Sequence, residues 1–192
     1  MRTAILEILF TVVGIWLYSS TGQGWEFFAG LVLLAYLGLV TVIDIEHRLI
    51  LHSISLTGGI LGLVYGTWQH GLIRTLAGGL VGFSVMLSFY FLGFLFIKIQ
   101  AKRRGTDPPE DALGFGDVNL SGVVGLLLGW PGVLAGLLLT ILIAGAVSLI
   151  YLLISIFRKR YQANLSIPYG PFIVASTIWL LYLREPLNYF NG

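Results

Sequence analysis

Apolar residues fill most of this chain in long runs that short polar segments interrupt. A helix needs about 20 apolar residues to cross a bilayer, and glycine, proline and other turn residues separate the runs. We therefore expect an all-α polytopic membrane protein, a bundle of about seven transmembrane helices that forms a single domain over residues 1–192. The predicted spans are 3–20, 26–44, 53–69, 72–98, 117–130, 132–157 and 168–184.

Composition agrees with this pattern. The chain is 57% hydrophobic and 10% charged, against about 25% charged residues in an average soluble domain, so we expect the lipid bilayer as a partner. A formal charge of +2 gives no indication of a nucleic-acid partner. Because the chain has no cysteine, disulfides, thiolate metal sites and a catalytic thiol are excluded.

Lysine and arginine predict the orientation, because cytoplasmic loops carry an excess of both. With the N-terminus inside, the outer side keeps only Arg74 and Arg184. The inner side holds Arg2, Arg48, Lys98, Lys102, Arg103, Arg104, Arg158, Lys159 and Arg160. The seven-span model is therefore N-in and C-out, and both Asp44 and Asp117 lie at its cytoplasmic face.

These two aspartates are the main candidates for chemistry. Asp44 ends the second apolar run, and Asp117 begins the fifth, within a GxGD motif whose glycines are Gly114 and Gly116. An acid at membrane depth costs a few kcal/mol unless it is compensated, which makes it a functional candidate. Two carboxylates that share one proton can activate water and protonate a carbonyl, as in an aspartic protease. Alternatively, Asp117 is a helix N-cap and Asp44 pairs with Arg48.

Other polar or turn residues flank the two acids. Glu46 follows Asp44 and could tune its protonation or be an interfacial residue. Pro168, Gly170 and Pro171 line the active site or begin the last helix, where proline is well tolerated. The histidines near Asp44 have no third ligand nearby, so we expect no metal and no cofactor.

Three segments resemble the prepilin peptidases, the type IV leader peptidase family of GxGD-type aspartic proteases. They are LLAYL leading to IDIEHRLI at 33–50, ALGFGDVNL at 112–120, and IPYGPF at 167–172, where the family has IPFGPF. The resemblance implies that Asp44 and Asp117 are catalytic and need no metal. It implies cleavage of the leader of type IV prepilins or pseudopilins, after a glycine, at the cytoplasmic face of a prokaryotic inner membrane. The particular substrate and the oligomeric state stay open.

The chain also departs from the family pattern. Leu51, His52 and Asn119 stand where the family usually has proline, a polar acid or amide, and lysine. By the resemblance Asn119 belongs to the active-site loop, where loss of the lysine would change rate and pH optimum. Bifunctional members methylate the new pilin N-terminus with a cysteine-bearing insert. This sequence has no such insert, so no methyltransferase domain is expected.

Three alternatives remain at this point. A transporter could use the same two acids to carry ions or protons, although it would favour acids near the midplane and an inverted repeat. The presenilin and signal-peptide-peptidase type shares GxGD but has Tyr-Asp and PAL motifs, where this chain has Ile43-Asp44 and IPYGPF. A catalytically inactive relative is the third alternative, because of Asn119.

Overall fold

The protein is seen here in a computed structural model, which describes residues 7, 11–15, 24–47, 52–104, 114–157 and 168–183. Those residues form helices and no strand, so the predicted all-α class is confirmed. The elements are α2 (Trp25–His47), α3 (His52–His70), α4 (Leu72–Arg104), α5 (Phe115–Leu128), α6 (Gly132–Phe157), α7 (Gly170–Ile178) and a π-helical turn η1 (Trp179–Leu183).

Three of the described helices are long and apolar enough to cross a membrane, namely Phe27–Glu46, Leu72–Arg103 and Gly132–Phe157. Two apolar helices are shorter, Phe115–Leu128 and Gly170–Tyr182. Together they make a polytopic membrane protein. The first predicted span lies largely outside the described residues, and the N-in, C-out orientation stays a prediction.

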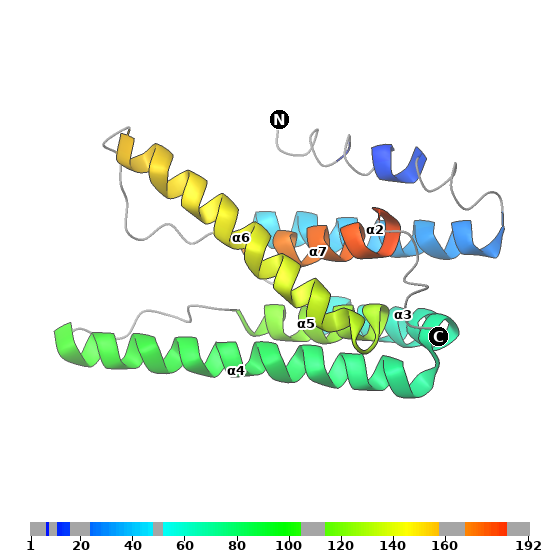
Figure 1. Cartoon of the computed structure of the whole chain (residues 1–192), viewed down its shortest axis with the longest axis horizontal. Helices are drawn as coiled ribbons and strands as arrows, with labels where there is room; N and C mark the ends of the chain where they lie inside the picture. Colours follow the sequence, from blue (N-terminus) through cyan, green and yellow to red (C-terminus); the bar gives the residue numbers. More distant parts are fainter. Residues whose placement is uncertain are drawn as a thin grey trace.

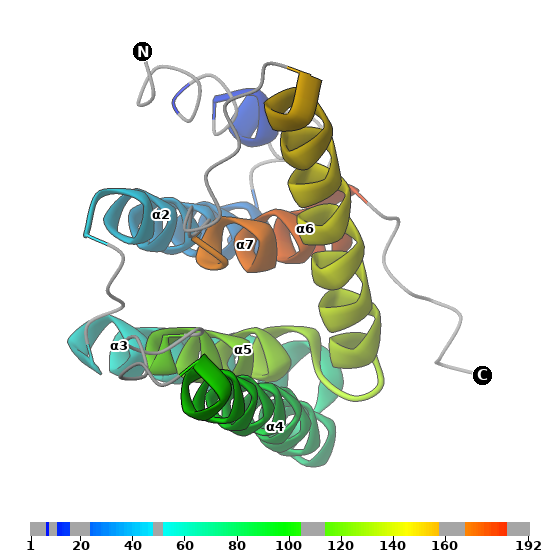
Figure 2. The same ribbon diagram turned by 90° about the vertical axis from the view of Figure 1, so that its left-hand side faces the viewer.

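The helices form two layers joined by α6. In Figure 2, α2 and α7 lie side by side in one layer, and α3, α4 and α5 form the other. α6 starts beside the second layer and runs obliquely to the first (Figure 1). Consecutive helices therefore cross back and forth, which brings the end of α2 and the start of α5 to the same end of the molecule.

Glycines let α4 and α5 pack with their backbones in contact. A Cβ on Gly125 would meet the carbonyl of Gly78, and a Cβ on Gly82 would meet the backbone of Ser121. Small residues at such interfaces are typical of membrane helices, where association depends on close van der Waals packing. α5 is thereby fixed against α4, the longest helix among the described residues.

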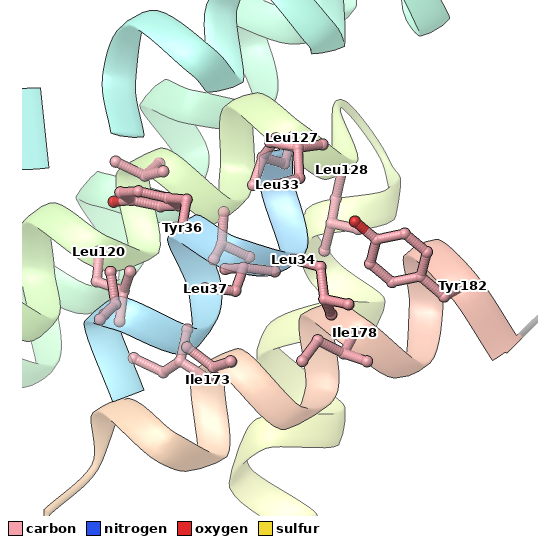
Figure 3. Packing of buried hydrophobic residues seen from close by; sticks show 14 of the residues in the cluster. Leu33, Leu34, Tyr36, Leu37, Leu120, Leu127, Leu128, Ile173, Ile178 and Tyr182 are labelled. Atoms are coloured by element: carbon pink, nitrogen blue, oxygen red, sulfur yellow. The ribbon is translucent and has the colours of Figure 1, made fainter. Parts of the chain in front are cut away.

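The buried core lies where α2, α5 and α7 meet. Leu37 of α2, Leu120 and Leu127 of α5, and Ile173 of α7 are almost fully buried and lie in one cluster (Figure 3). In the layer of α2 and α7, the Tyr182 hydroxyl of η1 donates a hydrogen bond to the carbonyl of Gly30 at 2.8 Å. α2 carries Asp44, α5 carries Asp117, and residues 168–171 lie at the start of α7. The packing of these three helices in the core therefore fixes the geometry of the candidate site.

Candidate active site

Asp44 lies in the last turn of α2, with 5% of its surface exposed. The helix continues past it to His47, whereas the sequence predicted that the span would end at Asp44. The carboxylate is therefore held on a formed helical turn. Arg48, the alternative partner of Asp44, lies outside the described residues.

Asp117 is the third residue of α5 and is 8% exposed. The helix begins earlier than the predicted span because Gly114 is the N-cap, with extended backbone angles (φ −70°, ψ 138°) and no capping side chain. The N–H of Asp117 donates to the carbonyl of Gly114 at 3.0 Å. The alternative that Asp117 is the N-cap is therefore wrong.

The fold brings the two acids together. The charge of Asp44, at the end of α2, acts on Asp117, at the start of α5, and both side chains are buried. Two buried carboxylates at one site cannot both ionise easily, so they favour a state with one shared proton. The separation of 73 residues in sequence is closed by the packing of α2, α5 and α7.

The first residue of α7 lies against Asp44. A Cβ built on Gly170 would lie 2.5 Å from Oδ2 and 2.9 Å from Cγ of Asp44, so only a glycine fits there without movement. The next residue back, Tyr169, is within reach of the charge of Asp117. Gly170 therefore sets the space that is open beside the Asp44 carboxylate.

The other residues that the sequence assigned to the site lie at the start of α5, at the start of α7 and at the end of α2. Gly114 lies beside Asp117, since a Cβ on it would be 3.9 Å from Oδ2 of that residue, and Gly116 is in the same first turn of α5. Pro168 and Pro171 are half-buried on either side of Tyr169 and Gly170, with Pro171 in the first turn of α7. Glu46 is exposed at the end of α2.

Asn119 lies away from the acids. Two residues along a helix turn the side chain by about 200°, so Asn119 and Asp117 point to opposite faces of α5. Asn119 lines a separate groove of about 440 Å³ between α3, α4 and α5, together with Ser55, Phe83 and Gly122. Asn119 follows the GxGD motif closely in sequence, but its side chain faces this groove and not the two carboxylates.

Tyr169 is the site residue that the sequence alone did not single out. It stood within the IPYGPF segment, but only its proline and glycine neighbours were assigned to the site. The available signal was the phenol itself, the one polar side chain in that segment. Among the described residues, no group of three or more His, Cys, Asp or Glu could hold a metal ion.

Comparisons with known proteins give a consistent result. Residues 31–153 match the model of the type IV leader peptidase family, a region that contains both aspartates. The prepilin leader peptidase/N-methyltransferase of Aeromonas hydrophila is 26% identical over 185 residues, covering 94% of this chain and 58% of that protein.

Two more proteins of the same name are similar, those of Xanthomonas campestris pv. campestris (26% identical, 93% of this chain, 56% of that protein) and Aeromonas salmonicida strain A449 (28%, 94% and 58%). The chain thus spans somewhat more than half the length of these relatives. No solved structure matches.

Proposed function

The chain belongs to the type IV leader peptidase family, and from that premise we propose that it is a membrane-embedded aspartic endopeptidase that removes the leader of type IV prepilins or related pseudopilins. The observation that carries the proposal is the burial of Asp44 and Asp117 on two different helices, close enough for the charge of one to act on the other. The substrate class comes from the names of the relatives, which are prepilin leader peptidases.

The chemistry needs only the two carboxyl groups and a water molecule. The ionised carboxylate takes a proton from water, and the water oxygen forms a bond to the scissile carbonyl carbon. The protonated carboxyl gives its proton to the carbonyl oxygen, which leaves one proton on the pair throughout. Collapse of the tetrahedral intermediate breaks the C–N bond: a proton from the pair goes to the leaving amine, and a hydroxyl of the intermediate returns a proton to the pair as the product carboxyl group forms.

The backbone around the acids suits an extended peptide. Gly114, Gly116 and Gly170 present no side chains next to the carboxylates, so a substrate strand can approach closely. Gly170 in particular lies against Asp44. We assign these glycines, with Pro168 and Pro171, to substrate contact or to the shape of the site.

The depth of the site also fits a substrate that begins with a short leader followed by an apolar helix. Phe115, at the start of α5, packs against Tyr90 of α4 with ring centroids 5.9 Å apart. α4 continues from there to Lys98, about 12 Å further at 1.5 Å per residue. Lys98, Lys102 and Arg103 are exposed, and clusters of this kind favour the cytoplasmic interface. We therefore propose a site on the cytoplasmic side of the inner membrane, slightly below the headgroups.

A cleavage assay tests the function. The purified chain, in lipid, is incubated with a prepilin and with the same prepilin in which the glycine before the scissile bond is replaced by valine. We expect intact mass to show loss of the leader from the first substrate and little from the second. The transporter would be favoured instead if no cleavage occurred and if vesicles that contain the chain showed a proton flux that is lost when Asp44 and Asp117 are replaced.

A further inference from the structure

The two helix layers are joined differently along their two edges. In Figure 2, α6 runs along one edge, and α2 and α3 form the opposite edge. α6 is held to both layers, because Thr140 shares a hydrogen bond of 2.6 Å with Ser176 of α7, and a Cβ on Gly136 would meet the side chain of Leu128 of α5. The α6 edge is therefore closed by direct contacts.

An apolar groove of about 350 Å³ lies along the α2–α3 edge. The side chains that line it are aliphatic or aromatic. Leu33 of α2 is almost fully buried, whereas Val64 and Trp68 of α3 line the same groove and are exposed. The groove therefore opens from the core onto the lipid-facing surface of the protein, and we call it the lateral groove.

The lateral groove and Asp44 share one face of α2. Leu33 and Asp44 are 11 residues apart, which is three helical turns, so they project in nearly the same direction about 16 Å apart along the axis. Trp25 lines the groove at its end farthest from Asp44, about 28 Å from that residue along α2. Tryptophan is typical of the membrane interface. The groove therefore leads from the side of the aspartates toward the opposite membrane surface.

Tyr36 marks the end of the lateral groove that is nearer the aspartates. It lies between Leu33 and Asp44 on α2, and its hydroxyl donates a hydrogen bond to the carbonyl of Ile54 of α3 at 3.2 Å. A Cβ on Gly58 would meet this hydroxyl, so the glycine makes room for the bond. The bond holds the two walls of the groove together at this end and so fixes the groove relative to Asp44.

We propose that the lateral groove docks the apolar helix that follows the scissile bond of the substrate. The assignment rests on the proposed peptidase function, because a chain cleaved at Asp44 and Asp117 must carry this helix across the membrane. A spanning helix is about 30 Å long, close to the distance from Asp44 to the far end of the groove. The groove beside Asn119 suits such a helix less well, since it lies on the other face of α5 and presents the polar side chains of Asn119 and Ser55.

Val64→Trp tests the docking site, because it fills the lateral groove from its rim. The substrate helix then loses apolar contact area, so KM for a full-length prepilin should rise about tenfold while kcat changes little. A short peptide that contains the scissile bond but no apolar helix should be cleaved as by wild type. Leu80→Trp is the matched control, since Leu80 is 69% exposed against 64% for Val64 but lines the groove beside Asn119. It should leave both substrates unaffected.

Photo-crosslinking tests docking without cleavage. Benzoylphenylalanine at position 64, in protein reconstituted in lipid with a prepilin, should attach to the apolar helix of the prepilin, and the same group at position 80 should not. Attachment at position 64 to lipid or to a second copy of this chain alone, or a wild-type KM for Val64→Trp, would overturn the docking site even if wild type cleaves prepilin. If position 64 captures the prepilin helix but wild type cleaves nothing, the peptidase function fails and the docking site stands.

Discussion

Replacing Gly170 with alanine tests whether the position of Asp44 matters for catalysis. The new Cβ would lie 2.5 Å from Oδ2, 2.9 Å from Cγ and 3.4 Å from Cβ of Asp44. An ordinary contact needs about 3.5 Å, so the carboxyl must move by about 1 Å. Misplacement of a reacting group by about 1 Å can cost about 100-fold in rate, which is the loss of kcat that we expect.

Stability should change much less. Overpacking costs about 1–3 kcal/mol, and the clash at Gly170 is with the end of one side chain. Alanine also has a helix propensity about 1 kcal/mol better than glycine. Gly145→Ala in α6 is the matched control, because a Cβ there meets nothing within 4 Å; it should keep full activity and equal or slightly higher stability.

The assay compares kcat and KM for prepilin cleavage in lipid with thermal unfolding followed by circular dichroism. The expected result for Gly170→Ala is a folded protein with a low kcat and a nearly unchanged KM. Wild-type kcat in a folded Gly170→Ala protein would refute the reasoning that Asp44 must stay where the glycine leaves it.

Three further predictions concern packing and the boundary of the site. Gly125→Ala should destabilise the protein by about 2 kcal/mol, because its Cβ would meet the carbonyl of Gly78; an unchanged melting temperature would contradict the packing of α4 on α5. The Thr140–Ser176 hydrogen bond, 2.6 Å long between α6 and α7, should give a coupling of about 0.6 kcal/mol in a double-mutant cycle with Val and Ala, and zero coupling would count against it. Asn119→Ala should retain most activity and the wild-type pH profile, since Asn119 lines the groove between α3, α4 and α5. A large fall in kcat would show that Asn119 takes part in the active site.

The helices were largely predictable from apolar runs bounded by turn residues. The run 132–157 matches α6 at both ends. Pro131 marks the turn directly before the helix begins, and the basic residues from Arg158 end the apolar run. α4 extends to Arg104, beyond the predicted end at Lys98, because lysine, arginine and glutamine are good helix formers even where they end an apolar run. Hydropathy measures where a span ends in lipid, and helices continue into water.

The site was only partly predictable. The aspartate pair could be found because a carboxylate in an apolar run is costly and therefore informative. Asn119 was assigned to the active-site loop by the family resemblance, although a helical period of 3.6 residues already separates it from Asp117 by more than half a turn. The close approach of Gly170 to Asp44 arises from the packing of α7 against α2 and α5, which no local pattern encodes.

The most direct test of the central claim is a comparison of Asp44→Asn, Asp117→Asn and the double variant in prepilin cleavage. Groups that act as one unit are strongly non-additive, so each single substitution should reduce cleavage to the same background as the double one, while all three proteins stay folded. Substantial cleavage by either single variant, or single losses that multiply in the double variant, would contradict a pair of aspartates that shares one proton.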